Sequence, residues 1–179
     1  MKPKTFSSGV LEEPVYVGID QSYSGFAICI LSEDSYFVTV HKGEGKGTDR
    51  LLDIKKTLKD ILCEYQILDI AMEGYAYGAQ MAHMAGELGG MVKTTLLEEF
   101  EIYPLIIPPA NLKKYVTGKG TGIQKNQMLL QIYKTWGIEF TDDNAADAYA
   151  LARMASGWHK TASQKEVLEK LQDPKFRNV

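Results

Sequence analysis

Short apolar runs separated by polar turns dominate the first half of the chain. Val15 to Ile19 is almost wholly apolar, which is typical of a central strand buried on both faces. Phe26 to Leu31 and Tyr36 to His41 follow after short polar connections, so we expect a meander of three antiparallel strands. The apolar runs Ile67 to Met72 and Ile102 to Ile107 come later, each after a helical pattern, and this order favours parallel pairing. The pattern therefore predicts an α/β fold with a five-stranded mixed sheet.

Apolar residues recur at helical spacing in the remaining segments, and we expect helices on both faces of the sheet. The predicted helices span residues 49–65, 80–100, 110–116, 124–136 and 144–158. The second of them contains Gly86, Gly89 and Gly90, although each glycine costs about 1 kcal/mol of helix stability relative to alanine. We therefore expect close approach to this helix, either by another element of the chain or by a second subunit.

Length and composition indicate a single globular unit. The 179 residues, 45% hydrophobic and 24% charged, suffice for one domain with a sizeable core. We expect an N-terminal extension over residues 1–14, one domain over 15–158, and a charged C-terminal tail over 159–179 with at most two exposed helical turns. No apolar run reaches the ~18 residues of a membrane span, and the N-terminus lacks the apolar core of a secretion signal. Cys29 and Cys63 have no metal-site spacing, so we expect a cytoplasmic protein with reduced cysteines.

The charge is unevenly distributed. The net charge is −3, yet the stretch from Ile102 to Ile138 contains no Asp or Glu. The lysines in this stretch are Lys113, Lys114, Lys119, Lys125 and Lys134. If the stretch folds into one surface, it forms a positive stripe on an acidic body, and we favour a nucleic-acid track over a solvated lysine face.

Carboxylates stand where two predicted strands end. Asp20 closes the first strand and Glu73 the fourth, so parallel pairing would bring them to one edge of the sheet. Asp147 lies one turn inside the last helix, with Asp143 or Asn144 on the same side. Such hard oxygen donors suit Mg²⁺ or Mn²⁺. Two such ions, roughly 4 Å apart, can activate a water and stabilise the leaving oxygen of a phosphodiester.

Four motifs in order carry a resemblance to a known family. They are GIDQSYSGFAI, MEGY, PPANLKKYVTGKGTGIQKNQM and NAADAYALA, and the likeness spans residues 15 to about 156. The chain resembles the RuvC-type Holliday junction resolvases of the retroviral-integrase/RNase H-like superfamily. The resemblance implies an RNase H-like fold and a homodimer that nicks two symmetric strands of a four-way DNA junction, with Mg²⁺, or Mn²⁺ in its place, as two ions per active site.

The resemblance also implies roles for individual residues. Asp20, Glu73 and Asp147 would be catalytic metal ligands. Family members carry an acidic residue or a histidine at the position of Asn144, so the fourth ligand is either Asp143, which we favour, or the Asn144 amide oxygen. The residues implied in DNA binding are Lys113, Lys114, Lys119 and Lys125, with Tyr75 and Tyr77 stacking on unpaired bases.

Three other functions are compatible with the sequence. The same nuclease fold could act on other branched DNA or on RNA, because phosphate contacts are generic. A sugar-kinase-like ATPase also opens with a strand, an acidic residue and a glycine-bearing turn, although this chain offers no second lobe. A non-catalytic junction-binding protein would result if Asn144 breaks the site.

Overall fold

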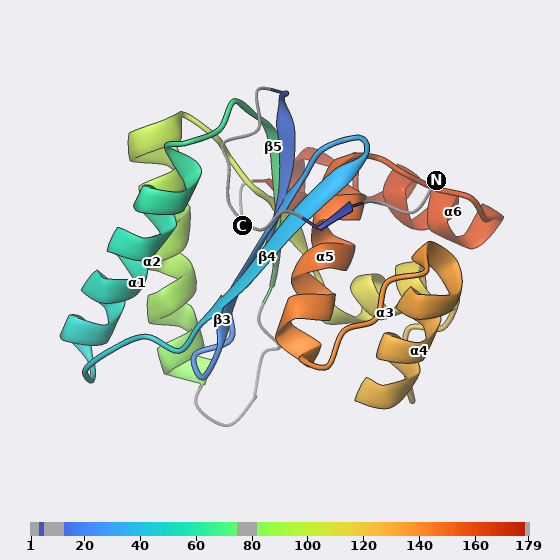
Figure 1. Cartoon of the computed structure of the whole chain (residues 1–179), viewed down its shortest axis with the longest axis horizontal. Coiled ribbons are helices and arrows are strands. Elements are labelled where there is room, and N and C mark those ends of the chain that lie inside the picture. Colours follow the sequence, from blue (N-terminus) through green and yellow to red (C-terminus); the bar gives the residue numbers. More distant parts are fainter. Residues whose placement is uncertain (1–3, 6–12, 75–81, 178–179) are drawn as a thin grey trace.

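A mixed β-sheet forms the centre of the molecule. The computed structural model describes residues 4–5, 13–74 and 82–177 (Figure 1). The strands are β1 (Lys4–Thr5), β2 (Val15–Asp20), β3 (Phe26–Leu31), β4 (Ser35–His41), β5 (Ile67–Glu73) and β6 (Leu105–Ile107). They are ordered β1-β4-β3-β2-β5-β6, with β2, β3 and β4 antiparallel and β2, β5 and β6 parallel. The predicted five-stranded mixed sheet is thus confirmed, and β1 extends it by pairing with β4.

Helices cover both faces of the sheet, as expected. They are α1 (Thr48–Leu62), α2 (Ala82–Phe100), α3 (Pro109–Thr117), α4 (Lys125–Trp136), α5 (Asp143–Ala155) and α6 (Ala162–Lys170), followed by the 3₁₀ turn η1 (Pro174–Phe176). Figure 1 shows α1 and α2 on one face and α3 to α6 on the other. Among the described helices, none has the length and apolar character needed to cross a membrane.

Side chains alternate between the two faces of the sheet along each strand, and each face carries its own hydrophobic core. Val17 and Ile19 of β2 face α1 and α2, whereas Gly18 faces α5. A Cβ atom at Gly18 would lie 2.0 Å from the carbonyl oxygen of Ala148, so α5 lies directly on the backbone of β2. Small side chains on α5 permit this approach, and its alanines from Ala145 to Ala152 are buried. The N-terminal turns of α5 are thereby held beside the end of β2.

Three predicted boundaries are wrong. The helix predicted over residues 49–65 ends at Leu62, and the local backbone explains the other two. The predicted strand from Ile102 begins only at Leu105, because Glu101 adopts a φ of 58° and the Ile102 amide still bonds to the carbonyl of Leu96 in α2. The last large helix ends at Ala155 rather than at residue 158. Gly157 has a φ of 69°, which turns the chain out of the helix.

The expectation of an exposed, fraying tail over residues 159–179 is wrong for its described part. Helix α6 begins with a capping box in which Thr161 and Gln164 bond to each other's backbone. Its apolar side packs into the core beneath α5, and the buried residues are Val167, Leu168, Leu171 and Phe176. Four apolar side chains in a charged segment are enough to dock it, because each removes apolar area from water. The proposed division at residues 14 and 158 stays a prediction.

Arg177 fastens the end of this segment to the sheet. Its Nη1 and Nη2 donate to Asp69 Oδ1 and Oδ2 at 3.0 and 2.7 Å, and Nη1 also donates to the carbonyl of Tyr103 at 2.9 Å. We expect Arg177→Ala to lower the free energy of unfolding by about 1 kcal/mol, measured by urea denaturation, since the pair is bidentate but partly exposed. Lys175→Ala, which breaks an exposed pair with Asp173, is the control and should change little. Equal changes in the free energy of unfolding for the two variants would contradict a stabilising role for the contacts of Arg177 with Asp69 and Tyr103.

Candidate active site

The two strand-end carboxylates meet at one edge of the sheet. Strands β2 and β5 are parallel, and Ile19 lies opposite Met72 in their register, so Asp20 and Glu73 follow on neighbouring strands. Asp20 is only 4% exposed, and its Oδ1 accepts a hydrogen bond from the Ser22 amide at 3.2 Å. Glu73 is half-buried. The sequence-based expectation that parallel pairing places these carboxylates together is confirmed.

Helix α5 brings its acidic first turns to the same edge. Asp142 caps the helix by accepting from the Ala145 amide at 3.0 Å, and Asp143 and Asp147 follow inside it. A cleft of about 190 Å³ opens beside them. The charged residues that line this cleft are Glu73, Lys113, Lys125, Asp143 and Asp147. Three of the four predicted acids thus share one cleft with two of the predicted lysines.

Burial and mutual repulsion raise the pKa values of the central carboxyl groups. Burial is the largest cause for Asp20, whose pKa is raised well above its usual value, followed by the charges of Glu73 and Asp147. Burial and Asp147 raise the pKa of Glu73 from 4.5 to about 7. Burial and Asp143 raise that of Asp147 from 3.8 to about 7. Lys113 opposes the last two shifts, so the cleft is an acidic cluster with an adjacent cation.

Asp143 and Asn144 point to different surroundings. The Lys125 ammonium donates to Asp143 Oδ2, which lowers the pKa of that carboxyl group and raises the pKa of Lys125. The Asn144 side-chain nitrogen lies 2.6 Å from the position that a Cβ on Gly25 would take, so Asn144 packs against the β2–β3 turn. Of the two alternatives, Asp143 lines the cleft, which favours it as the fourth donor.

The other predicted DNA-binding residues are distributed more widely. Lys114 pairs with Glu166 of α6 at 2.7 Å, and Lys119 is exposed on the loop between α3 and α4. Tyr75 and Tyr77 lie outside the described residues. Two lysines of residues 102–138, Lys114 and Lys125, therefore form ion pairs with acids of α6 and α5.

A contact through Gln21 joins the site to α2, and the sequence did not single out this residue. Gln21 Nε2 donates to the carbonyl oxygen of Glu73 at 2.7 Å, while Oε1 is buried without a partner among the described residues. A Cβ on Gly89 would lie 2.5 Å from Oε1. The expected close approach to α2 thus occurs at Gly89, from the same chain. A Cβ on Gly86 or Gly90 would meet nothing within 4 Å in the described structure.

The donor set has the chemistry of a divalent-cation site. Asp20, Glu73 and Asp147 are hard oxygen donors that repel one another, and a bound cation would relieve this repulsion. Within the described segments, no three Asp, Glu, His or Cys side chains stand close enough to enclose an ion. Coordination would therefore require side-chain rotation, including release of Asp143 from Lys125.

The raised pKa values predict an unusual pH dependence of stability without metal. Glu73 and Asp147 bind protons more tightly in the folded chain than in the unfolded one, so folding is favoured at low pH. As the pH rises from about 4 to about 7, we expect these groups to reduce the free energy of unfolding by on the order of 3 kcal/mol. Urea denaturation in EDTA measures this decline. Glu73→Gln should flatten it, and an unchanged slope would contradict the raised pKa of Glu73.

Comparison with known proteins identifies the fold. No protein-family model and no curated sequence matches the chain. It is similar to the Thermus thermophilus RuvC structure, with a TM-score of 0.63 and 19% identity over 77% of this chain and 90% of that one. It is also similar to T. thermophilus RuvC in complex with a Holliday junction substrate, with a TM-score of 0.64 and 17% identity over 78% and 90% of the two chains. The chain has the RuvC-like form of the RNase H-like fold.

Proposed function

We propose that this chain is a structure-selective DNA endonuclease that resolves four-way junctions by metal-dependent nicking of two symmetric strands. The observation that carries the proposal is that Asp20 and Glu73 end neighbouring strands and that the charges of Glu73 and of Asp147 on α5 raise the pKa of Asp20. The RuvC-like fold supports it, and one similar structure is a complex with a Holliday junction substrate. Within that fold, one buried and three half-buried carboxylates beside two lysines suit hydrolysis of a phosphodiester.

The acids would act as donors to two Mg²⁺ or Mn²⁺ ions. When bound, such ions supply an activated water and stabilise the leaving oxygen of the phosphodiester. Asp20, Glu73 and Asp147 would hold them from two strand ends and one helix, with Asp143 as the fourth donor. Asp20 is buried and therefore shielded from water, and the hydrogen bond from the Ser22 amide orients its Oδ1.

The two cleft lysines would position the DNA strand. Lys113 lies beside Glu73 and Asp147, where its ammonium can take a phosphate next to the scissile bond. The side chain of Lys125 is 81% exposed, so it can exchange its contact with Asp143 for a phosphate oxygen. Such contacts fix the register of the backbone and carry no base preference.

A comparison of substrates tests the proposal directly. Cleavage with Mg²⁺ or Mn²⁺ is measured on a four-way junction, a flap, a linear duplex and a structured RNA of matched length. We expect paired nicks in opposite strands of the junction and little cleavage of the duplex. Faster cleavage of the flap or of the RNA would instead identify other branched DNA or RNA as the substrate. Absence of any cleavage would contradict nuclease activity.

We also propose that the active form is a homodimer, because a two-fold substrate suits two symmetric active sites. The side of α2 that carries Gly86 and Gly90 is open in the described structure, and closely packed helices use such small residues.

Light scattering tests the dimer and its interface. We expect the wild type to have twice the chain mass of 20.0 kDa. Gly86→Leu should bring it down to one chain mass, because a large side chain separates the helices. Lys56→Leu on the exposed side of α1 is the control. A Gly86→Leu protein that stays dimeric would remove this face from consideration.

A further inference from the structure

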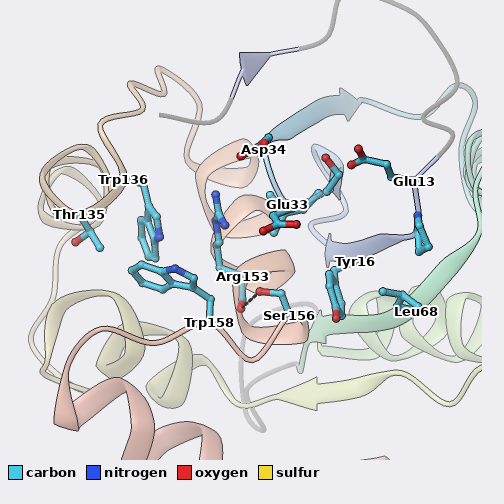
Figure 2. A pocket seen from close by; sticks show the side chains of 13 residues that line it. Glu13, Tyr16, Glu33, Asp34, Leu68, Thr135, Trp136, Arg153, Ser156 and Trp158 are labelled. Carbon is cyan, nitrogen blue, oxygen red and sulfur yellow. Dashed lines mark hydrogen bonds between the residues drawn. The ribbon is translucent and has the colours of Figure 1, made fainter. Parts of the chain in front are cut away.

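A second, larger cleft lies at the end of the sheet away from the carboxylates. Its volume is about 840 Å³, within the range of ~300–1,000 Å³ that is usual for ligand sites. Leu31 at the end of β3 contributes to its wall. So do Tyr16 near the start of β2 and Leu68 near the start of β5 (Figure 2). The last turn of α5 forms another side through Arg153. The cleft is therefore separate from the proposed nuclease site.

Arg153 is a buried cation for which the described residues provide no anionic partner. It is only 8% exposed, and its Nε donates to the hydroxyl of Tyr149 at 2.7 Å. Burial raises the pKa of the nearby Cys29, Tyr115 and Tyr149 side chains, so all three are neutral near pH 7. Over the part of the chain that the structure describes, no carboxylate pairs with Arg153. The helix dipole places at most about half a negative charge at the C-terminal end of α5, which does not neutralise Arg153. The two terminal nitrogens of Arg153 can therefore bind an anion.

Two indole rings stand beside the guanidinium. The rings of Trp136 and Trp158 have centroids 5.4 Å apart at an interplanar angle of 50°. Trp136 Nε1 is buried and has no acceptor among the described residues. The cleft thus combines the terminal nitrogens of Arg153 with an aromatic wall. This combination suits an oxyanion attached to an apolar body.

Acidic side chains lie across the cleft from the indoles. Glu13, Glu33 and Asp34 are exposed and line the same cavity, and Figure 2 shows them on the side opposite Trp136 and Trp158. These charges repel a polyanion such as a nucleic-acid backbone. They favour a ligand that carries one negative group, next to Arg153, and positive groups at the ends that face the three acids.

From this arrangement we infer that the cleft docks a short segment of a partner protein. The segment presents one Asp or Glu side chain to Arg153, packs apolar neighbours against the indoles and Leu68, and turns basic side chains toward the three acids. Leu68 is 52% exposed, which extends the apolar wall to the surface where a chain can enter. The inference does not depend on nuclease activity.

Matched peptides test this inference. The probes are acetyl-Lys-Leu-Glu-Leu-Lys-amide, the same peptide with Gln in place of Glu, and the charge-swapped acetyl-Glu-Leu-Lys-Leu-Glu-amide. The chain contains two tryptophans, and both line this cleft, so tryptophan emission, excited selectively over the ten tyrosines, reports on it. We expect a saturable emission change with the Glu peptide, with affinity roughly tenfold or more above that of the Gln peptide. The charge-swapped peptide should not bind.

Two variants and two further ligands complete the test. Arg153→Gln should abolish the preference for Glu over Gln. In case that variant does not fold, the exposed double variant Glu33→Gln/Asp34→Asn should weaken binding roughly two- to fivefold, with Glu87→Gln on α2 unchanged. Equal affinity for the Glu and Gln peptides, or the absence of any emission change, would overturn the inference. Binding of inorganic phosphate or duplex DNA in preference to the peptide would overturn it in favour of an anion or nucleic-acid site.

Discussion

Replacing Asp20 with Asn is expected to reduce metal-dependent cleavage of a four-way junction by on the order of a thousandfold. Asp20 is the most buried of the four acids and interacts with the other three through its charge. Asn keeps the shape and the hydrogen bond from the Ser22 amide but removes the negative charge that would hold a divalent ion. Single-turnover cleavage rates at saturating Mg²⁺ measure the effect.

Stability distinguishes this loss from misfolding. Without metal, Asp20 is a desolvated carboxyl group repelled by Glu73 and Asp147, so Asp20→Asn should leave the free energy of unfolding unchanged or higher in EDTA. Asp60→Asn on the exposed side of α1 is the matched control and should cleave like the wild type. Retained cleavage by Asp20→Asn would refute the assignment of Asp20 as a metal ligand.

The positions of the acids followed from local patterns in the sequence. Asp20 and Glu73 each end an apolar run, and the rule for parallel pairing of strands separated by a helix placed them side by side, as observed. Asp147 was identified because it is a charged residue within an alanine-rich, apolar helix. Each of these features is contained in a short stretch of consecutive residues, which is why it could be recognised before the fold was known.

Contacts between distant segments could not be predicted in this way. The docking of α6 depends on Val167 and Leu168 finding a surface made by α3 and α5, and a charged composition concealed it. The small residues of α2 indicated a close approach, but only the fold reveals that Gln21 reaches Gly89. The sequence did not single out Arg153. Its burial results from the packing of α5 against β2 and β3, where the described residues supply no carboxylate to pair with it.

Gly89→Ala is expected to lower junction cleavage by roughly 10- to 100-fold although Gly89 touches no carboxylate. The added Cβ would lie 2.5 Å from Gln21 Oε1, the end of a flexible side chain that can move. Moving it breaks the hydrogen bond from Gln21 Nε2 to the Glu73 carbonyl and frees the end of β5 relative to β2. A shift of about 1 Å in one donor of a metal site is enough for a loss of this size.

Gly90→Ala is the matched control, because it makes the same change one residue further along α2 and its Cβ meets no described atom within 4 Å. Since Gly90 lies on the proposed dimer face, light scattering must first show that this variant has the same mass as the wild type. Both substitutions gain about 1 kcal/mol of helix propensity, so a drop in activity confined to Gly89→Ala cannot come from the helix itself. Gln21→Ala should show a similar loss, and the double variant should lose no more than either single one, since both remove the same contact. Additive losses, or equal rates for the two alanine variants of α2, would mean that Gln21 does not position Glu73.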